Sequence, residues 1–492
     1  MTTDCKRSTA GCLSTLFVSA AMILASVTAV RAQTSPSAQQ AEIERLKIII
    51  EIKQERIEAL ERELASYREV RKAGRDRKIA AEIQSEVERL RGLTAKRPVE
   101  TAPLTPEVLE RLLDEAISDR YTEEQFRGWE TMLKHLGLVP AEMQLRQFLR
   151  TLYSEQLAGL YNDKTKKLYV SDKFDFNSTI GKIILAHEIC HALQDQHFDL
   201  TSSPLYLKTN DDRALAALSV VEGDAMLVMG EYWRENPSWR LLLELPRLLM
   251  MDQQQIACAP DFLTHSLLFP YMQGMTFITD CAVARRDWGP SIMQYVVKPG
   301  EIEWEDTWFR VRNYLLQNYP RSTEQIIHPE KYYGANPDEP TDIALDALTT
   351  DGLIPSENRY NNVAGEFGIR SLLGEGLPVR EAETAAAGWD GDRLVSGGQL
   401  DGAYAIAWLS VWDSPRDARE FADALARFFK AQRPELVEQT ADPADNVWLA
   451  DKRGSIAIAR DEIRVAFVQA TDREHAERIL ETLLSVEVQL VP

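Results

Sequence analysis

Residues 185–200 read LAHEICHALQDQHFDL and contain three histidines, His187, His191 and His197. Two of them enclose Glu188 in the pattern His-Glu-x-x-His. On a helix, residues four apart lie about 40° from each other on one face. His187 and His191 can therefore bind one Zn²⁺ through their imidazoles, and Glu188 can take a proton from a zinc-polarised water. The pattern predicts a helix with two zinc ligands; the alternative is a buried helix with hydrogen-bonded core histidines.

Two residues compete as the third ligand. His197 follows His191 by six residues, which is the metzincin spacing, but Gln194 stands where metzincins have a helix-ending glycine. Glutamine is a good helix former, and a continuing helix turns His197 about 240° away from His191. Glu222 lies in the apolar stretch 214–233, where a buried carboxylate needs a partner or a metal. The sequence therefore favours Glu222, with ligation through His197 as the alternative.

Four stretches carry a resemblance to known enzymes: AGLYNDKTKKLYVSD (158–172), LAHEICHALQDQHFDL (185–200), VEGDA (221–225) and STEQIIHPEKYY (322–333). Together they resemble a family of secreted bacterial metallopeptidases within the gluzincins, the thermolysin-like clan. The resemblance implies a zincin-like peptidase domain, Zn²⁺ on His187, His191 and Glu222, and Glu188 as the general base.

The resemblance also raises the question of which residues support the zinc site. Thermolysin has a carboxylate that orients a zinc histidine at the position that Met226 occupies in this chain. We expect Asp195 or Asp224 to take over that role.

Two further peptidase features are expected. One strand of the predicted hairpin, AGLY or KLYVS, can pair with a peptide substrate, although an ordinary exposed hairpin is equally consistent. A donor to the developing oxyanion is also needed, and His328, Tyr332 and Tyr333 are candidates. His328 could instead cap a helix before Pro329.

The N-terminus is typical of a secretory signal, residues 1–32, with Lys6 and Arg7 before an apolar stretch and a small-residue cleavage site ending at Ala32. An uncleaved anchor is the alternative. We expect an exported chain, periplasmic or extracellular, with no stable membrane span after cleavage. Of the cysteines beyond the signal, Cys258 and Cys281 are the expected disulfide pair, because Cys190 lies inside the histidine motif.

Residues 33–100 contain a helical region with a heptad pattern. Seven of its eight seam positions are apolar or aromatic and one is Lys53; the eight are Ile43, Leu46, Ile50, Lys53, Ile57, Leu60, Leu64 and Tyr67. The pattern predicts either a coiled coil that forms a homodimer or a helix that packs on its own catalytic domain.

The rest of the chain divides into a mainly helical metallopeptidase-like domain, 101–380, and a small α+β domain, 381–492. The predicted fold class is therefore α+β, with a small hairpin or sheet in the first of these domains. In the second we expect a helix capped by Ser414 and a last helix that begins at Thr471 with Glu474 in a capping box.

Composition limits the function. The formal net charge is −20, with 76 acidic and 56 basic residues, which argues against a nucleic-acid partner. We expect an exported zinc metallopeptidase acting on a peptide or protein substrate. The alternative is a non-catalytic exported scaffold that binds zinc.

Overall fold

The computed structural model describes residues 36–156, 159–171, 175–240, 259–284, 304–334, 337–439 and 446–489. The chain divides into two units, residues 1–78 and 79–492. The described residues form an α+β fold with one three-stranded and one seven-stranded sheet. The predicted signal peptide and Cys258 lie outside the described residues, so signal cleavage and the disulfide with Cys281 stay predictions. None of the described helices is long and apolar enough to cross a membrane.

Helix α2 (Pro36–Arg91) includes the helix that the heptad pattern predicts over residues 43–67, and it continues without a break to Arg91. Its last turns belong to the second unit, where they bury an apolar stripe against helix α6. The stripe consists of Ile79, Ile83, Val87 and Leu90. Arg91, the last residue of α2, is fully buried, and its charge therefore needs partners in the interior.

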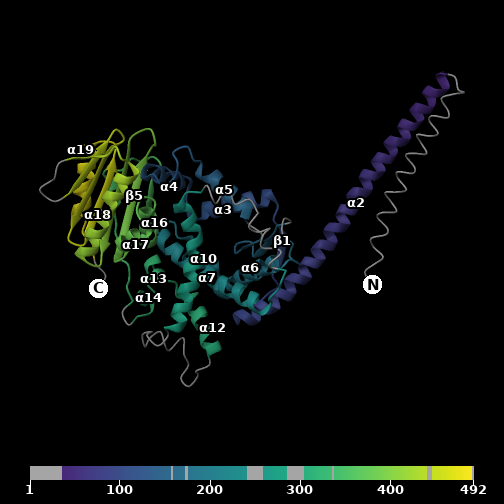
Figure 1. The fold of residues 1–492 in the computed structure, drawn as a ribbon, viewed down its shortest axis with the longest axis horizontal. Coiled ribbons are helices and arrows are strands. Elements are labelled where there is room, and N and C mark those ends of the chain that lie inside the picture. The colour runs from purple at the N-terminus through teal and green to yellow at the C-terminus, as the bar shows by residue number, and fades with distance from the viewer. Residues whose placement is uncertain are drawn as a thin grey trace. The chain divides into compact units, whose positions relative to one another are not determined.

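Helices dominate the part of the second unit before residue 350. They are α3 (Pro106–Arg120), α4 (Glu123–Leu136), α5 (Leu145–Gln156), α6 (Thr179–Phe198), α7 (Asp211–Glu235), α10 (Asp261–Val283), α12 (Trp304–Leu315), α13 (Thr323–Ile327), α14 (Glu330–Tyr333) and α15 (Asp346–Thr350), with two 3-10 turns at Leu200–Ser202 and Pro204–Tyr206. Figure 1 shows α7 and α10 near the middle of this unit, and α6 nearer to β1.

The small sheet has the strand order β1-β3-β2. Strands β2 (Gly159–Asn162) and β3 (Lys167–Val170) form the predicted hairpin and pair antiparallel. Strand β1 (Glu100–Pro103) pairs parallel to β3. In the described sheet β3 is therefore the central strand, and β2 is an outer strand that contacts α6.

Local signals explain where helix α6 begins and ends. Helix α6 begins after Ser178, whose side chain accepts from the backbone N–H of Gly181, and it runs for 20 residues to Phe198. It ends at Asp199, which has a φ of 50°.

Helix α10 crosses α7 closely. A Cβ on Gly274 of α10 would lie only 1.8 Å from the backbone oxygen of Ser219 in α7. Glycine at 274 is thus required for this crossing.

The C-terminal sheet has the order β4-β5-β6-β10-β9-β8-β7, with all neighbouring pairs antiparallel. Its strands are β4 (Tyr360–Asn362), β5 (Trp389–Gly398), β6 (Tyr404–Trp412), β7 (Val437–Gln439), β8 (Val447–Asp451), β9 (Gly454–Asp461) and β10 (Arg464–Ala470). Strand β4 lies upstream of position 381, where we placed the start of the domain. Both faces of the sheet are buried, because alternate residues of β6 and β10 enter two separate apolar cores.

Helices cover both faces of this sheet (Figure 1). Helix α18 (Pro415–Gln432) packs in one core together with α16 (Gly365–Gly374) and α17 (Val379–Ala386), and α19 (Arg473–Ser485) packs in the other. The predicted cap of α18 is confirmed, since Ser414 accepts from the backbone N–H of Asp417. The predicted cap of α19 is wrong by one residue: Asp472, rather than Thr471, accepts from the N–H of His475. Asp472 is as good an acceptor as Thr471, and the backbone decides between them.

Candidate metal centre

Helices α6 and α7 bring three potential ligand atoms together. Nε2 of His187 and Nε2 of His191 lie 3.0 Å apart, and Oε2 of Glu222 lies 3.1 Å from the first and 3.4 Å from the second. A tetrahedral Zn²⁺ with bonds of about 2.0–2.1 Å separates its ligand atoms by about 3.3 Å. The three atoms therefore have the spacing that a zinc ion requires, and the side chains stay 10–13% exposed.

The charges of this group are coupled. Burial alone would lower the pKa of His191, but Glu222 outweighs it and raises that pKa to about 9. Burial alone would raise the pKa of Glu222, but His191 and His187 outweigh it and lower that pKa strongly. A carboxylate between two imidazoles is thus held in its ionised form, the form in which it can bind a metal.

Gln194 fixes the orientation of His191. The amide Nε2 of Gln194 donates to the backbone oxygen of Val221 at 3.0 Å and to Oδ2 of Asp224 at 2.7 Å. Its Oε1 is therefore an acceptor, and it lies 2.9 Å from Nδ1 of His191. The Gln194 acceptor keeps a proton on Nδ1 of His191, so Nε2 is the nitrogen that would lose its proton and bind a metal.

Asp224 is the anchor of this arrangement and is completely buried. Nε of Arg91 donates to its Oδ2 at 2.7 Å, and Nε of Arg312 donates to its Oδ1 at 2.5 Å. Burial alone would raise the pKa of Asp224, but the two guanidinium groups lower it to about 2. Because both arginines are also fully buried, the three charges depend on one another. The prediction that Asp224 supports a zinc histidine fits this geometry, with Gln194 as the link.

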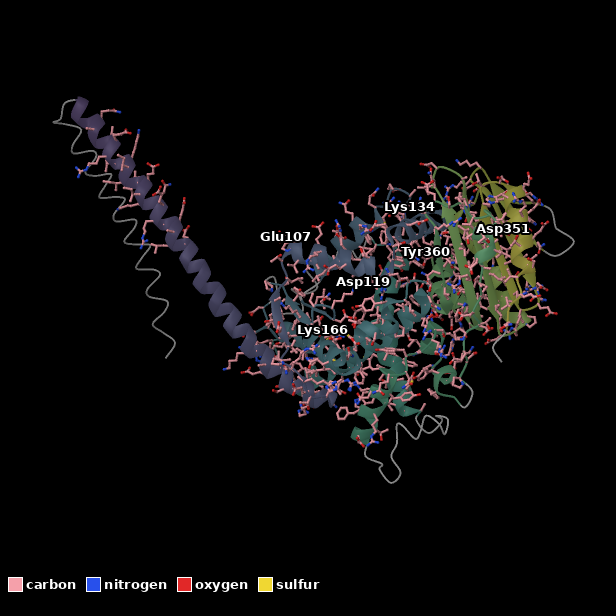
Figure 2. All side chains as sticks on the ribbon, turned by 180° about the vertical axis from the view of Figure 1, so that it is seen from behind. Glu107, Asp119, Lys134, Lys166, Asp351 and Tyr360 are labelled. Carbon is pink, nitrogen blue, oxygen red and sulfur yellow. The ribbon has the colours of Figure 1, made fainter. Side chains whose placement is uncertain are left out.

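Asp195 has a different environment from the one expected as an alternative. It accepts from the hydroxyl of Tyr161 at 2.7 Å and from Nζ of Lys166, a residue labelled in Figure 2, at 2.7 Å. These contacts tie α6 to the β2–β3 hairpin. None of the described hydrogen bonds of Asp195 involves His187 or His191.

Glu188 lies one residue after His187 and is also buried. Its Oε2 accepts from the backbone N–H of Tyr161 in strand β2 at 2.7 Å. Burial raises the pKa of the Glu188 carboxyl, and the neighbouring His187 and His191 oppose that effect. A carboxylate whose pKa is raised in this way accepts a proton more readily, as a general base must.

His197 points away from the three ligand atoms, as the continuing helix predicts. Helix α6 passes through Gln194 without a break. Nε2 of His197 lies 2.8 Å from the backbone oxygen of Thr94, in the segment after α2, and the residue is half-buried. The geometry therefore disfavours metzincin-like ligation through His197.

The three proposed oxyanion donors belong to helices α13 and α14 and the residue that joins them. His328 is the C-cap of α13, and its Nε2 lies 3.0 Å from Oε1 of Glu366, which raises the pKa of the imidazole. The hydroxyl of Tyr332 donates to the backbone oxygen of Asn318 at 2.6 Å. Tyr333 occupies the short helix α14 with Tyr332. None of the described hydrogen bonds of His328 reaches His187, His191 or Glu222, and its catalytic role stays a prediction.

Four residues near the centre were missed in the sequence. Arg91 and Arg312 lie 133 and 88 positions from Asp224 along the chain, so no local pattern connects them. Gln194 was read only as a helix former. Tyr271 of α10 stacks on His187, with ring centroids 6.1 Å apart and planes at 27°. The close crossing of α7 by α10 brings this tyrosine to the site.

Comparison with known proteins bears on another part of the chain. The model of a family described as Domain of unknown function (DUF8575) matches residues 353–480. The match covers the seven-stranded sheet and most of α19, and it does not include His187, His191 or Glu222. The searches of curated proteins and of solved structures gave no significant match. The fold and the geometry of the site define the chain as an α+β protein in which two histidines and one glutamate are placed so that they could bind a metal.

Proposed function

We propose that this chain is an exported zinc metallopeptidase with a zincin-like catalytic domain. Its zinc ligands are His187, His191 and Glu222, and Glu188 is the general base. One observation carries the proposal: three ligand atoms converge at 3.0–3.4 Å on two packed helices, next to a carboxylate that binds none of them. Two histidines, one glutamate and an open fourth position form the usual zinc arrangement of such peptidases.

Zinc bound at this set would polarise the scissile carbonyl and the attacking water. Glu188 takes the proton from the water and passes it to the leaving amine. The N–H of Tyr161 holds Oε2 of Glu188, so Oε1 is the oxygen that receives the proton. The raised pKa of the buried carboxyl favours this transfer.

Strand β2 supports a peptide as the substrate. In an antiparallel pair, alternate residues direct their backbone groups toward and away from the partner strand. The N–H of Tyr161 reaches Glu188 and therefore points away from β3. Gly159 lies two residues earlier and shares this direction, and a Cβ on Gly159 would meet Cγ of Glu188 at 3.5 Å. The outer side of β2 thus offers backbone groups to an extended peptide beside the base.

A Glu188→Gln variant tests the proposal. The variant should bind one zinc per chain like the wild type, because Glu188 is not a ligand. It should cleave a pool of fluorogenic peptides at least about 10²-fold more slowly. His197→Gln is the matched control on the same helix, and it should keep both zinc and activity.

Three results would argue against the proposal. Unchanged cleavage by Glu188→Gln would remove the mechanism. If metal analysis by mass spectrometry finds no zinc in the wild-type protein, the proposed ligation by His187, His191 and Glu222 is refuted. Bound zinc without cleavage of any peptide in the pool would favour the non-catalytic scaffold.

A further inference from the structure

The N-terminal part of α2 carries an apolar stripe that is open to solvent. The seam positions Ile43, Ile50, Ile57 and Leu60 are 46%, 58%, 48% and 47% exposed. An isolated helix with repeated exposed isoleucines is unfavourable in water, and such a stripe marks a contact surface. Neighbouring Ile48 and Ile52 are also exposed, but their side of the helix has no repeat in the following heptads. Among the described side chains, the stripe that repeats is the seam from Ile43 to Leu60.

We propose that this seam binds a second copy of the same chain as a parallel, in-register coiled coil. Each heptad has two seam positions, and residues 43, 50, 57 and 64 are the first of each pair. In such a dimer, the residue just before a first seam position faces the residue five places later on the second copy. The pairs formed in this way are Glu42 with Lys47, Ile49 with Gln54, Arg56 with Glu61, and Glu63 with Arg68. All three charged pairs join opposite signs. The sequence of the helix thus complements itself in the parallel, in-register arrangement.

The residues of the seam fit the same arrangement. Isoleucine at the first seam position and leucine at the second favours two strands in parallel coiled coils. Ile43, Ile50 and Ile57 occupy the first position, and Leu46 and Leu60 occupy the second. Lys53 stands at a second position and would face Lys53 of the other copy. A single polar layer of this kind weakens the dimer, and its long side chain can extend to solvent at the edge of the seam.

The test is a charge exchange in the chain that lacks the predicted signal peptide. The mass from light scattering should be that of a dimer for the wild type. Arg56→Glu places two like-charge pairs in the dimer and should raise the dissociation constant about tenfold or more. The double variant Arg56→Glu/Glu61→Arg restores opposite charges and should recover wild-type dimerisation. Glu55→Arg, on the outer side of the helix, should leave it unchanged.

A second measurement fixes the orientation of the two helices. Leu60→Cys places a thiol in the seam, and mild oxidation should link two copies through this residue in a parallel, in-register dimer. Glu55→Cys should give no such product. The proposal fails if the wild type is a monomer at tens of micromolar or a higher oligomer. It also fails if the charge exchange gives no recovery, or if Leu60→Cys links no better than Glu55→Cys.

Discussion

The strongest test of the metal centre is the replacement of Gln194 by methionine. This change keeps the length of the side chain and removes its hydrogen bonds to His191 and Asp224, which are 2.9 and 2.7 Å long. Residues that orient a zinc ligand typically contribute 10- to 100-fold to metal affinity. We therefore expect Gln194→Met to weaken zinc binding by that factor, which corresponds to about 1.4–2.7 kcal/mol.

The same variant should also lose stability without metal. The amide of Gln194 has acceptors on Val221 and Asp224, and a buried acceptor left without its donor costs about 1–3 kcal/mol. Zinc affinity is measured by competition with a chromogenic chelator, and the free energy of unfolding by urea denaturation of the metal-free protein. The two quantities separate the effect on the metal from the effect on the fold.

Gln196→Met is the matched control. Gln196 lies on the same helix with a similar side chain, and it accepts from the backbone N–H groups of Lys96 and Arg97 at 2.7 and 3.1 Å. Its loss should therefore reduce stability and leave zinc affinity unchanged. The reasoning is refuted if Gln194→Met binds zinc within twofold of the wild type, or if Gln196→Met weakens zinc binding as strongly.

Other predictions concern the ligands, the helix packing and the pH dependence. Glu222→Gln should lose zinc in a chelator titration while His197→Gln keeps it; the opposite result would support ligation through His197. Gly274→Ala should destabilise the fold by about 1–3 kcal/mol in urea, because the new methyl group overlaps the backbone of Ser219. Burial lowers the pKa of His135 to about 4, below the ordinary 6.5 of an unfolded chain. The unfolded state thus takes up a proton first, and the free energy of unfolding falls as the pH drops from about 6.5 to 4. The free energy of unfolding of His135→Gln should fall less over that range, and an equal loss in both proteins would contradict this.

Parts of the fold with a regular local pattern could be predicted from the sequence. The histidine helix, the hairpin and the cap of α18 follow from spacing and turn residues. Strand β5 was missed because it contains Gly391 and Gly397, which are typical of turns. Both glycines are needed by packing: a Cβ at either would lie 2.2 Å from a backbone oxygen of another segment. Asp392, in the same strand, looks polar but accepts from the indole N–H groups of Trp389 and Trp408 in the interior.

The same distinction applies to the candidate site, where the proposed ligands and base follow a local pattern and their supporting residues do not. His187, Glu188 and His191 form a helical pattern, and Glu222 could be inferred because an apolar stretch makes an unpaired carboxylate costly. For the support of a zinc histidine, the sequence left two candidates, Asp195 and Asp224, and gave no sign that Gln194 links Asp224 to His191. Which partner fills it depends on how α2, α6, α7 and α12 pack together, and that is a property of the tertiary structure.

The supporting network shows how packing and charge alone can hold the proposed ligand set in place. Arg91 and Arg312 come from distant parts of the chain, and both must be in place to neutralise Asp224 in the interior. Asp224 then holds Gln194, and Gln194 holds His191. Small zinc domains fold only with their metal because their ligands have no other support. Here the charge network and the packed helices provide that support, so a metal bound at the proposed ligand set would not be needed to create it.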